Sequence, residues 1–168
     1  MPVPERQLIV KRPFDLDQYE RRVKDGPCFV CAFLAGDPDY RHHRVYEDDD
    51  TVVFLGRYPT LLGHCLVAPK AHVESWNDEM TEPEFLRFQA VVYRVARAIA
   101  AVLPTERMYS LSLGSRQGNA HLHWHLAPLP PGVPYDEQQF HALMAVNGVL
   151  AVDDPAQAAL ARRINAGL

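Results

Sequence analysis

The sequence predicts an α+β domain in which an antiparallel sheet of about five strands packs against one long amphipathic helix, with helical extensions at both ends. Two observations predict this class. Short apolar or alternating segments bounded by turn residues recur along the chain, whereas residues 81–103 repeat their apolar side chains every three or four positions. The 168 residues, of which 48% are hydrophobic and 23% charged, suffice for one domain with a buried core.

The strands are predicted from apolar runs and from the turns between them. The acidic turn Asp48-Asp49-Asp50 separates two short apolar runs, which indicates a β-hairpin. A further run ends at Pro69. The predicted strands are residues 45–46, 52–55, 63–68, 108–113 and 121–126.

The long helix has a start signal of its own. Thr81 and Glu84 form a capping-box pattern, and Pro83 is compatible with the first turn of a helix. The apolar residues behind them lie on one helical face, so we expect that face to pack on the sheet. They are Phe85, Phe88, Val92, Val95, Ile99 and Leu103.

The central domain is expected at residues 27–130, after an N-terminal extension of residues 1–26. That extension contains a short apolar run over residues 8–10 and a possible helix over 15–24. The pattern therefore predicts a helical segment before the sheet begins.

A C-terminal extension, residues 131–168, is expected to be helical and to pack on the domain. One helix is predicted over 136–146. The other is expected to start at an Asp154 cap followed by Pro155 and to end with arginines, which suit the negative end of a helix dipole.

Charge and hydropathy restrict the partners. The net charge is −4, and the 17 basic residues form no run, which argues against a general nucleic-acid binder but not against a small phosphorylated ligand. No apolar stretch approaches the roughly 20 residues that span a bilayer. The N-terminus lacks the layout of a signal peptide, so we expect no membrane partner and a cytoplasmic location.

The most informative segment is an alternation of histidines with apolar residues. His121, His123 and His125 alternate with Leu122, Trp124 and Leu126, so on a strand the imidazoles would share one face. Three adjacent imidazoles can bind a metal or attack phosphorus, because a neutral imidazole is a good nucleophile. The alternative is a half-exposed strand whose polar face happens to be histidine.

The cysteines add a second candidate site. Cys28 and Cys31 are spaced as zinc ligands, as a redox pair or by coincidence, and no preceding strand supports the redox interpretation. Three cysteines are too few for a disulfide scaffold, and Cys65 is most simply a core residue. We expect His42, His43 and His141 to be structural or surface residues.

The order and spacing of several segments resemble the histidine triad (HIT) family, in particular its zinc-containing bacterial branch and dinucleoside polyphosphate hydrolases. The resemblance covers roughly residues 28–128 and implies a HIT-like fold. The segments that carry it are Cys28-Phe-Val-Cys31, Leu34-Ala-Gly-Asp37, Val45-Tyr46-Glu47-Asp48, Val53-Phe54-Leu55, Gly63 to His72, and His121 to Leu126.

The resemblance implies a role for each of these residues. His123 matches the nucleophile that becomes nucleotidylated, and His125 matches the residue that contacts the leaving-group oxygen. One structural zinc ion per chain is implied, and small relatives of this branch pair through the long helix, which implies a homodimer. The implied zinc ligands are Cys28, Cys31, His72 and His121.

The implied substrate-binding residues are Phe54, His64, Gln117, Gly118 and Asn119. His64 is equally compatible with a phosphate contact and with an ordinary strand residue. Gly118 stands where the family has a hydroxyl residue, although its backbone N–H or a donor from Asn119 would still suit a phosphate.

Gly56 stands where the family has an acid that holds the ribose hydroxyls, and Arg57 follows it. We therefore expect a hydrolase that cleaves a nucleotide phosphoanhydride or phosphoramidate through a nucleotidyl-histidine, with an altered nucleoside pocket. The alternatives are a nucleotide-binding protein with little turnover and a zinc-stabilised interaction domain.

Overall fold

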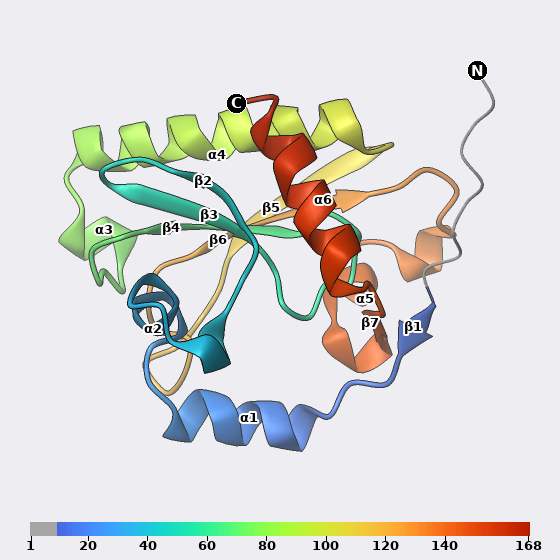
Figure 1. The fold of residues 1–168 in the computed structure, drawn as a ribbon, viewed down its shortest axis with the longest axis horizontal. Coiled ribbons are helices and arrows are strands. Elements are labelled where there is room, and N and C mark those ends of the chain that lie inside the picture. Colours follow the sequence, from blue (N-terminus) through green and yellow to red (C-terminus); the bar gives the residue numbers. More distant parts are fainter. Residues whose placement is uncertain (1–9) are drawn as a thin grey trace.

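The computed structural model describes residues 10–168 and has at its centre a five-stranded antiparallel sheet of order β2-β3-β4-β6-β5 (Figure 1). The predicted α+β class is confirmed. The strands of this sheet are β2 (Arg44–Glu47), β3 (Thr51–Leu55), β4 (Cys65–Pro69), β5 (Arg107–Ser112) and β6 (Trp124–Leu129).

Helices and two short strands surround the sheet. The α-helices are α1 (Leu16–Asp25), α2 (Phe29–Leu34), α3 (Trp76–Glu79), α4 (Glu82–Val102), α5 (Phe140–Leu143) and α6 (Asp154–Asn165). The 3-10 turns are η1 (Pro38–Tyr40), η2 (Tyr135–Glu137) and η3 (Ala145–Asn147), and the short strands are β1 (Lys11–Arg12) and β7 (Val149–Leu150). Among the described residues no helix is both long and apolar enough to cross a membrane.

The sheet is buried on both faces, and alternate residues of β3 show how. Val53 and Leu55 join the core beneath α4 and α6, whereas Val52 and Phe54 point to the opposite face and pack with α2. Figure 1 shows α4 and α6 crossing at one side of the sheet. His125 is paired with Leu66, which faces α2, so the histidine segment opens on the α2 face.

The long helix α4 begins as the sequence predicts. The Thr81 hydroxyl accepts a bond from the Glu84 N–H, and the Glu84 carboxylate accepts one from the Thr81 N–H at 2.7 Å. These reciprocal bonds satisfy donors that the first turn leaves free. Four residues of the predicted stripe are buried, and Phe85 and Leu103 are half-buried at its ends.

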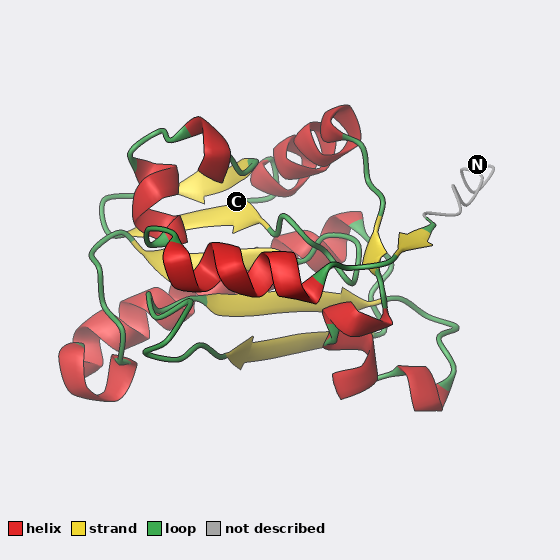
Figure 2. Ribbon diagram, turned by 90° about the horizontal axis from the view of Figure 1, so that it is seen from below, coloured by secondary structure: helices red, strands yellow, loops and turns green. Residues whose placement is uncertain are grey.

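The two extensions meet each other. β1 pairs with β7 through Lys11↔Leu150 and Arg12↔Val149, which ties the chain before α1 to the chain before α6. The view from below shows α1 in front of the sheet (Figure 2). The helix predicted over 15–24 is confirmed as α1, whereas the apolar run over 8–10 lies, except for its last residue, outside the described residues. The three-part division of the chain stays a prediction.

Two boundary predictions are wrong. The histidine strand begins at Trp124 rather than at His121, because the preceding backbone bonds outside the sheet. The Leu122 N–H donates to Val73 O at 2.6 Å, and His123 O accepts from the Ser112 hydroxyl at 2.8 Å. The cap of α6 is Asp153 rather than Asp154, since its carboxylate accepts from the Ala156 N–H.

The continuous helix predicted over 136–146 is also wrong. The structure has η2, α5 and η3 there, and Gln139 interrupts them with a φ of 56°. The Gln139 N–H donates to the Tyr109 hydroxyl of β5 at 2.8 Å instead of to a carbonyl one turn earlier. A tertiary contact therefore replaces the helical hydrogen bond.

Candidate active site and metal site

A cavity of about 670 Å³ opens beside the histidine segment. Its walls come from α1, from the turn before α2, from the segments 56–60 and 113–120, and from residues 143–146. All three histidines of the segment line this cavity, whereas the alternating apolar residues do not. The predicted shared face is therefore confirmed, and the half-exposed alternative fails because His121 and His123 are only 1% and 4% exposed.

His123 is held in one orientation by the backbone. Its Nδ1–H donates to His121 O at 2.7 Å, which leaves the lone pair on Nε2. The Phe29 ring meets the imidazole edge-on with centroids 5.3 Å apart. Burial lowers the pKa of His123, although the bond to His121 O works in the opposite direction.

His125 and His64 form a hydrogen-bonded pair. His64 Nε2 lies 2.9 Å from His125 Nδ1, and His64 immediately precedes β4. Burial lowers the pKa of His125 to about 3 and that of His64 to about 4, so both rings are neutral at pH 7. One nitrogen of the contact therefore donates and the other accepts.

The buried Nδ1 of His64 indicates which nitrogen donates. It has no hydrogen-bond partner among the described residues. An orphaned buried N–H is rarer than an orphaned acceptor, so we assign the His64 proton to Nε2. His64 then donates to His125 Nδ1, and His125 has its own proton on Nε2.

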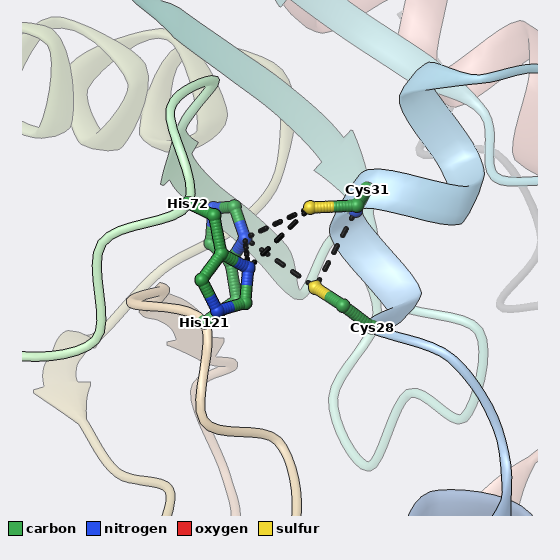
Figure 3. A group of neighbouring side chains, drawn as sticks. All are labelled: Cys28, Cys31, His72 and His121. Carbon is green, nitrogen blue, oxygen red and sulfur yellow. Dashed lines mark hydrogen bonds between the residues drawn. The ribbon is translucent and has the colours of Figure 1, made fainter.

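The predicted metal ligands come together from three separate segments (Figure 3). Cys28 caps α2 and Cys31 lies in its first turn, so the two sulfurs lie close together. His72 follows β4 and His121 precedes β6. The four ligand atoms all lie within 4.8 Å of one another.

The distances and the tautomers fit zinc. Bonds of about 2.3 Å to sulfur and 2.0–2.1 Å to nitrogen place tetrahedral ligands roughly 3.3–3.8 Å apart. His121 Nδ1 lies 3.4 Å from Cys28 Sγ, 3.6 Å from Cys31 Sγ and 3.2 Å from His72 Nδ1. Four protein ligands close the shell, which is typical of structural rather than catalytic zinc.

Each histidine of this cluster is oriented by a partner on its far side. His121 Nε2–H donates to Pro69 O at 2.7 Å, and His72 Nε2–H faces the Glu74 carboxylate at 3.0 Å. Both rings therefore present an unprotonated Nδ1 to the two sulfurs. Such outer partners are the usual support of zinc-binding histidines.

The predicted phosphate-binding residues Gln117, Gly118 and Asn119 lie in one loop, and two of them already form hydrogen bonds within the protein. The Gly118 N–H donates to Ser115 O, and the Asn119 amide donates to the Tyr19 hydroxyl of α1 at 2.9 Å. A Cβ on Gly118 would lie 2.4 Å from Val23 Cγ1, so a hydroxyl residue at this position would require the Val23 side chain of α1 to shift. Gln117 is exposed at the cavity mouth. The Gly118 N–H is therefore not a free phosphate donor in this structure.

Phe54 and Gly56 take different positions relative to the cavity. Phe54 is 0% exposed and does not line the cavity, although its ring packs on His42, which does. Gly56 lines the cavity beside His64, where an added Cβ would meet His64 O at an ordinary 3.5 Å. Packing therefore does not require glycine at the position of the family's ribose-binding acid.

The remaining residues predicted to be structural or on the surface have contacts of their own, although His42 also lines the cavity. Cys65 is buried in the main core, as predicted. His42 bonds to Leu55 O, His43 pairs with Asp154, and the His141 side chain is exposed.

Sequence reasoning missed the cavity wall that α1 supplies. Tyr19, Arg22, Arg57 and Tyr58 all line the cavity. The Phe14, Tyr19 and Tyr58 rings pack together with centroids 5.2–5.7 Å apart. The only signal was Arg57 next to Gly56, since nothing in residues 1–26 indicates where that segment packs.

Known proteins resemble this chain in sequence and in fold. The model of the HIT domain family matches residues 38–131. Protein hit of Bacillus subtilis is 31% identical over 107 residues, which cover 61% of this chain and 70% of that protein. A hypothetical histidine triad nucleotide-binding protein from Sulfolobus tokodaii has a TM-score of 0.66 at 25% identity, over 83% of this chain and 91% of that one.

A zinc-bound histidine triad family protein from Mycobacterium smegmatis has a TM-score of 0.63 at 26% identity, again over 83% of this chain and 91% of that one. The family model alone covers more than half of the 168 residues. Together with the alternating histidines on the cavity, these matches show that the chain belongs to the histidine triad (HIT) family.

Proposed function

We propose that this protein hydrolyses a nucleotide phosphoanhydride or phosphoramidate through a nucleotidyl intermediate on His123, as in dinucleoside polyphosphate hydrolases. One observation carries the proposal. His123 donates its Nδ1–H to His121 O, so its unprotonated Nε2 remains for a phosphorus atom in the cavity. Family membership and the nucleotide-binding name of the Sulfolobus tokodaii protein support a nucleotide as ligand.

The reaction has two displacements at one phosphorus. Nε2 of His123 attacks, an N–P bond forms, and the bond breaks from phosphorus to the leaving oxygen of an anhydride or to the leaving nitrogen of a phosphoramidate. His125 hydrogen-bonds that oxygen through Nε2–H, and a phosphate leaving group departs as its anion. A phosphoramidate nitrogen additionally takes up a proton from solvent. Water then displaces the imidazole, the electron pair returns to Nε2, and the water proton passes to solvent.

The test is a substrate panel with a trapped intermediate. The panel contains adenosine 5′-phosphoramidate and diadenosine tri- and tetraphosphate. The wild type should turn over at least one of these and give a nucleotidyl adduct on His123 after a neutral quench. His123→Ala should lose about 10³-fold or more in turnover, while the exposed His141→Ala serves as the matched control.

The outcomes separate the candidate functions. Near-wild-type turnover by His123→Ala would overturn the mechanism. Nucleotide-dependent thermal stabilisation without turnover would instead indicate a binding protein, which Gly56 favours as the second candidate. If nucleotides neither stabilise the protein nor are turned over, a zinc-stabilised interaction domain is the remaining candidate.

We also propose one structural zinc ion at Cys28, Cys31, His72 and His121. The support is the fit of their spacing and tautomers to tetrahedral zinc, together with the zinc-bound protein from Mycobacterium smegmatis. The ion would hold His121 and thereby the backbone that orients His123.

A homodimer is proposed through α4 and the neighbouring edge of the sheet. Tyr93 is 62% exposed and Leu86 is 57% exposed on the outer side of α4, and β5 is an edge strand. Light scattering at micromolar concentrations should give twice the 19.0 kDa chain mass, and a 19.0 kDa species alone would refute this proposal.

A further inference from the structure

The cavity wall is positively charged although the chain as a whole is acidic. Four lining side chains are cationic, namely Arg22, Lys24, Arg57 and Arg116. Among the described residues no aspartate or glutamate lines the cavity. The whole chain has 21 acidic and 17 basic residues, so the cavity departs from the average in the direction that attracts anions.

Two of these arginines converge on a single neutral oxygen. Arg22, from α1, and Arg57, from the segment after β3, both donate to Asp39 O, the latter at 2.6 Å. Neither guanidinium forms an ion pair with a carboxylate in the part of the chain that the structure describes. Two like charges therefore meet without an anion to neutralise them.

Aromatic rings hold both guanidinium groups in place. Arg22 lies over the ring of Tyr40 at 4.2 Å, and Arg57 lies 5.9 Å from the ring of Tyr58. Each guanidinium has five N–H donors, and the contact with Asp39 O uses one from each. The remaining donors suit the oxygens of a phosphate, which arginine binds in a bidentate manner.

The arginine pair and the reacting histidines belong to one continuous cavity. Arg22, Arg57 and His123 line this same cavity, and the Phe29 ring packs on both His42 and His123, with centroids 6.3 Å and 5.3 Å away. The positive charges of Arg57 and Arg22 add to burial in lowering the pKa of His42, so both arginines lie close enough to act on this cavity-lining residue. A cavity of about 670 Å³ is large enough for a nucleotide.

We propose that Arg22 and Arg57 form a second phosphate subsite, which binds one phosphate of a ligand while another is attacked at His123. This proposal rests on the proposed function. The second phosphate is either on the sugar or further along a polyphosphate chain. Gly56, beside Arg57, adds no acid that would repel either group.

Calorimetry with four adenosine nucleotides tests the subsite. The probes are the 5′-monophosphate, the 5′-diphosphate, the 3′,5′-bisphosphate and the 2′,5′-bisphosphate. The wild type should bind at least one two-phosphate probe about tenfold or more tightly than the monophosphate. In Arg22→Gln/Arg57→Gln that advantage should fall to within about threefold, with monophosphate binding retained.

Matched variants control for net charge and folding. Arg21→Gln removes the neighbouring charge of α1, which is exposed and does not line the cavity, and should keep the full advantage. Arg22→Lys/Arg57→Lys keeps both charges without the planar guanidinium groups. This variant should recover part of the affinity advantage of the two-phosphate probes. Melting temperatures of all variants check that they fold.

Each outcome decides the proposal. Preference for a bisphosphate places the second phosphate on the sugar, and preference for the diphosphate places it on the chain. Equal affinities in the wild type, or an advantage that survives in the double glutamine variant, would overturn the subsite. Turnover of the whole substrate panel by the wild type is measured in parallel, so the absence of any turnover counts against the proposed function and not against the subsite.

Discussion

The proposed zinc cluster and the cavity hold their imidazole rings in opposite tautomers. In the cluster, His121 donates Nε2–H to Pro69 O and presents Nδ1 to the sulfurs. In the cavity, His123 donates Nδ1–H to His121 O and keeps Nε2 free. The carbonyl partner thus decides which ring nitrogen stays unprotonated, Nδ1 for the proposed zinc ligand and Nε2 for the proposed nucleophile.

His121 connects the two regions. Its ring belongs to the cluster, whereas its main-chain oxygen fixes the tautomer of His123. Any movement of the cluster would therefore move the acceptor that orients His123, the proposed nucleophile. The comparison predicts that damage to the cluster affects zinc content, stability and chemistry together, and that loss of the His123 ring affects chemistry while the metal ligands stay in place.

The largest expected effect is on stability after loss of a zinc ligand. The wild type should bind about one zinc ion per chain. Cys28→Ser should bind less, because serine is a poor ligand for zinc. Zinc contributes about 10–16 kcal/mol of apparent binding in small peptides, so even a partial loss of about 4 kcal/mol would lower the Tm by roughly 8–16 °C.

Metal analysis and calorimetric melting measure this effect. Cys31→His, which keeps four ligands, is the matched variant and should retain zinc and most of the stability. A metal-free wild type with an unchanged melting temperature would contradict the role assigned to the cluster.

The second prediction separates the two neighbouring histidines. His123→Ala should lose turnover by about 10³-fold or more yet keep zinc and the fold, because its ring is not a ligand. His121→Ala should lose zinc, stability and turnover together. Equal zinc contents in the two variants would break the proposed division between ligand and nucleophile.

Local sequence patterns predicted the sheet, α4 and the metal cluster well. The capping pair Thr81 and Glu84 is a short-range signal, and the alternation along the histidine segment indicates its face directly. The cluster was predicted through the spacing of Cys28 and Cys31 and through family resemblance, which links residues that are distant in sequence.

The wall formed by α1 was not predictable, for a physical reason. The helix α1 contacts the loop of residues 113–120 through a hydrogen bond between Tyr19 and Asn119, which lie 100 positions apart. Neither residue belongs to a periodic pattern that indicates the other. Gly118 had suggested an altered phosphate contact, whereas the structure shows that a hydroxyl residue there would require Val23 to shift. The break at Gln139 is likewise due to a tertiary bond that sequence periodicity does not record.

A smaller effect is expected from the partner of His125. His64→Ala should leave His125 Nδ1 without its donor, so His125 is free to move its proton from Nε2 to Nδ1. Turnover of substrates with poor leaving groups should then fall about 10- to 100-fold. Substrates with good leaving groups need less help and should change little.

If His64 had only a structural role, its loss would slow substrates with good and poor leaving groups equally. A larger loss for poor leaving groups therefore distinguishes a role through His125. His64→Gln, which offers an amide N–H donor, should recover part of the rate. An equal loss for good and poor leaving groups would indicate that His64 only supports the fold.

The smallest expected effect concerns acid stability through His42, which lies on the cavity floor away from the zinc ligands. Burial lowers its pKa to about 4, with further contributions from Arg57, Arg22 and His43, and its Nδ1–H donates to Leu55 O. The unfolded chain has an ordinary imidazole pKa near 6.5 and therefore binds a proton first as the pH falls. The free energy of unfolding that His42 contributes is thus complete above about pH 6.5 and is lost as the pH falls toward 4. The loss is at most about 1.4 kcal/mol per pH unit.

Denaturant titrations between pH 7.5 and 4.5 measure this contribution. The unfolding free energy plotted against pH should have a slope smaller by up to one proton in His42→Gln than in the wild type. Acid release of zinc affects both proteins equally, so the difference in slope reports His42, and identical slopes would show that the pKa of this ring is the same in the folded and unfolded states.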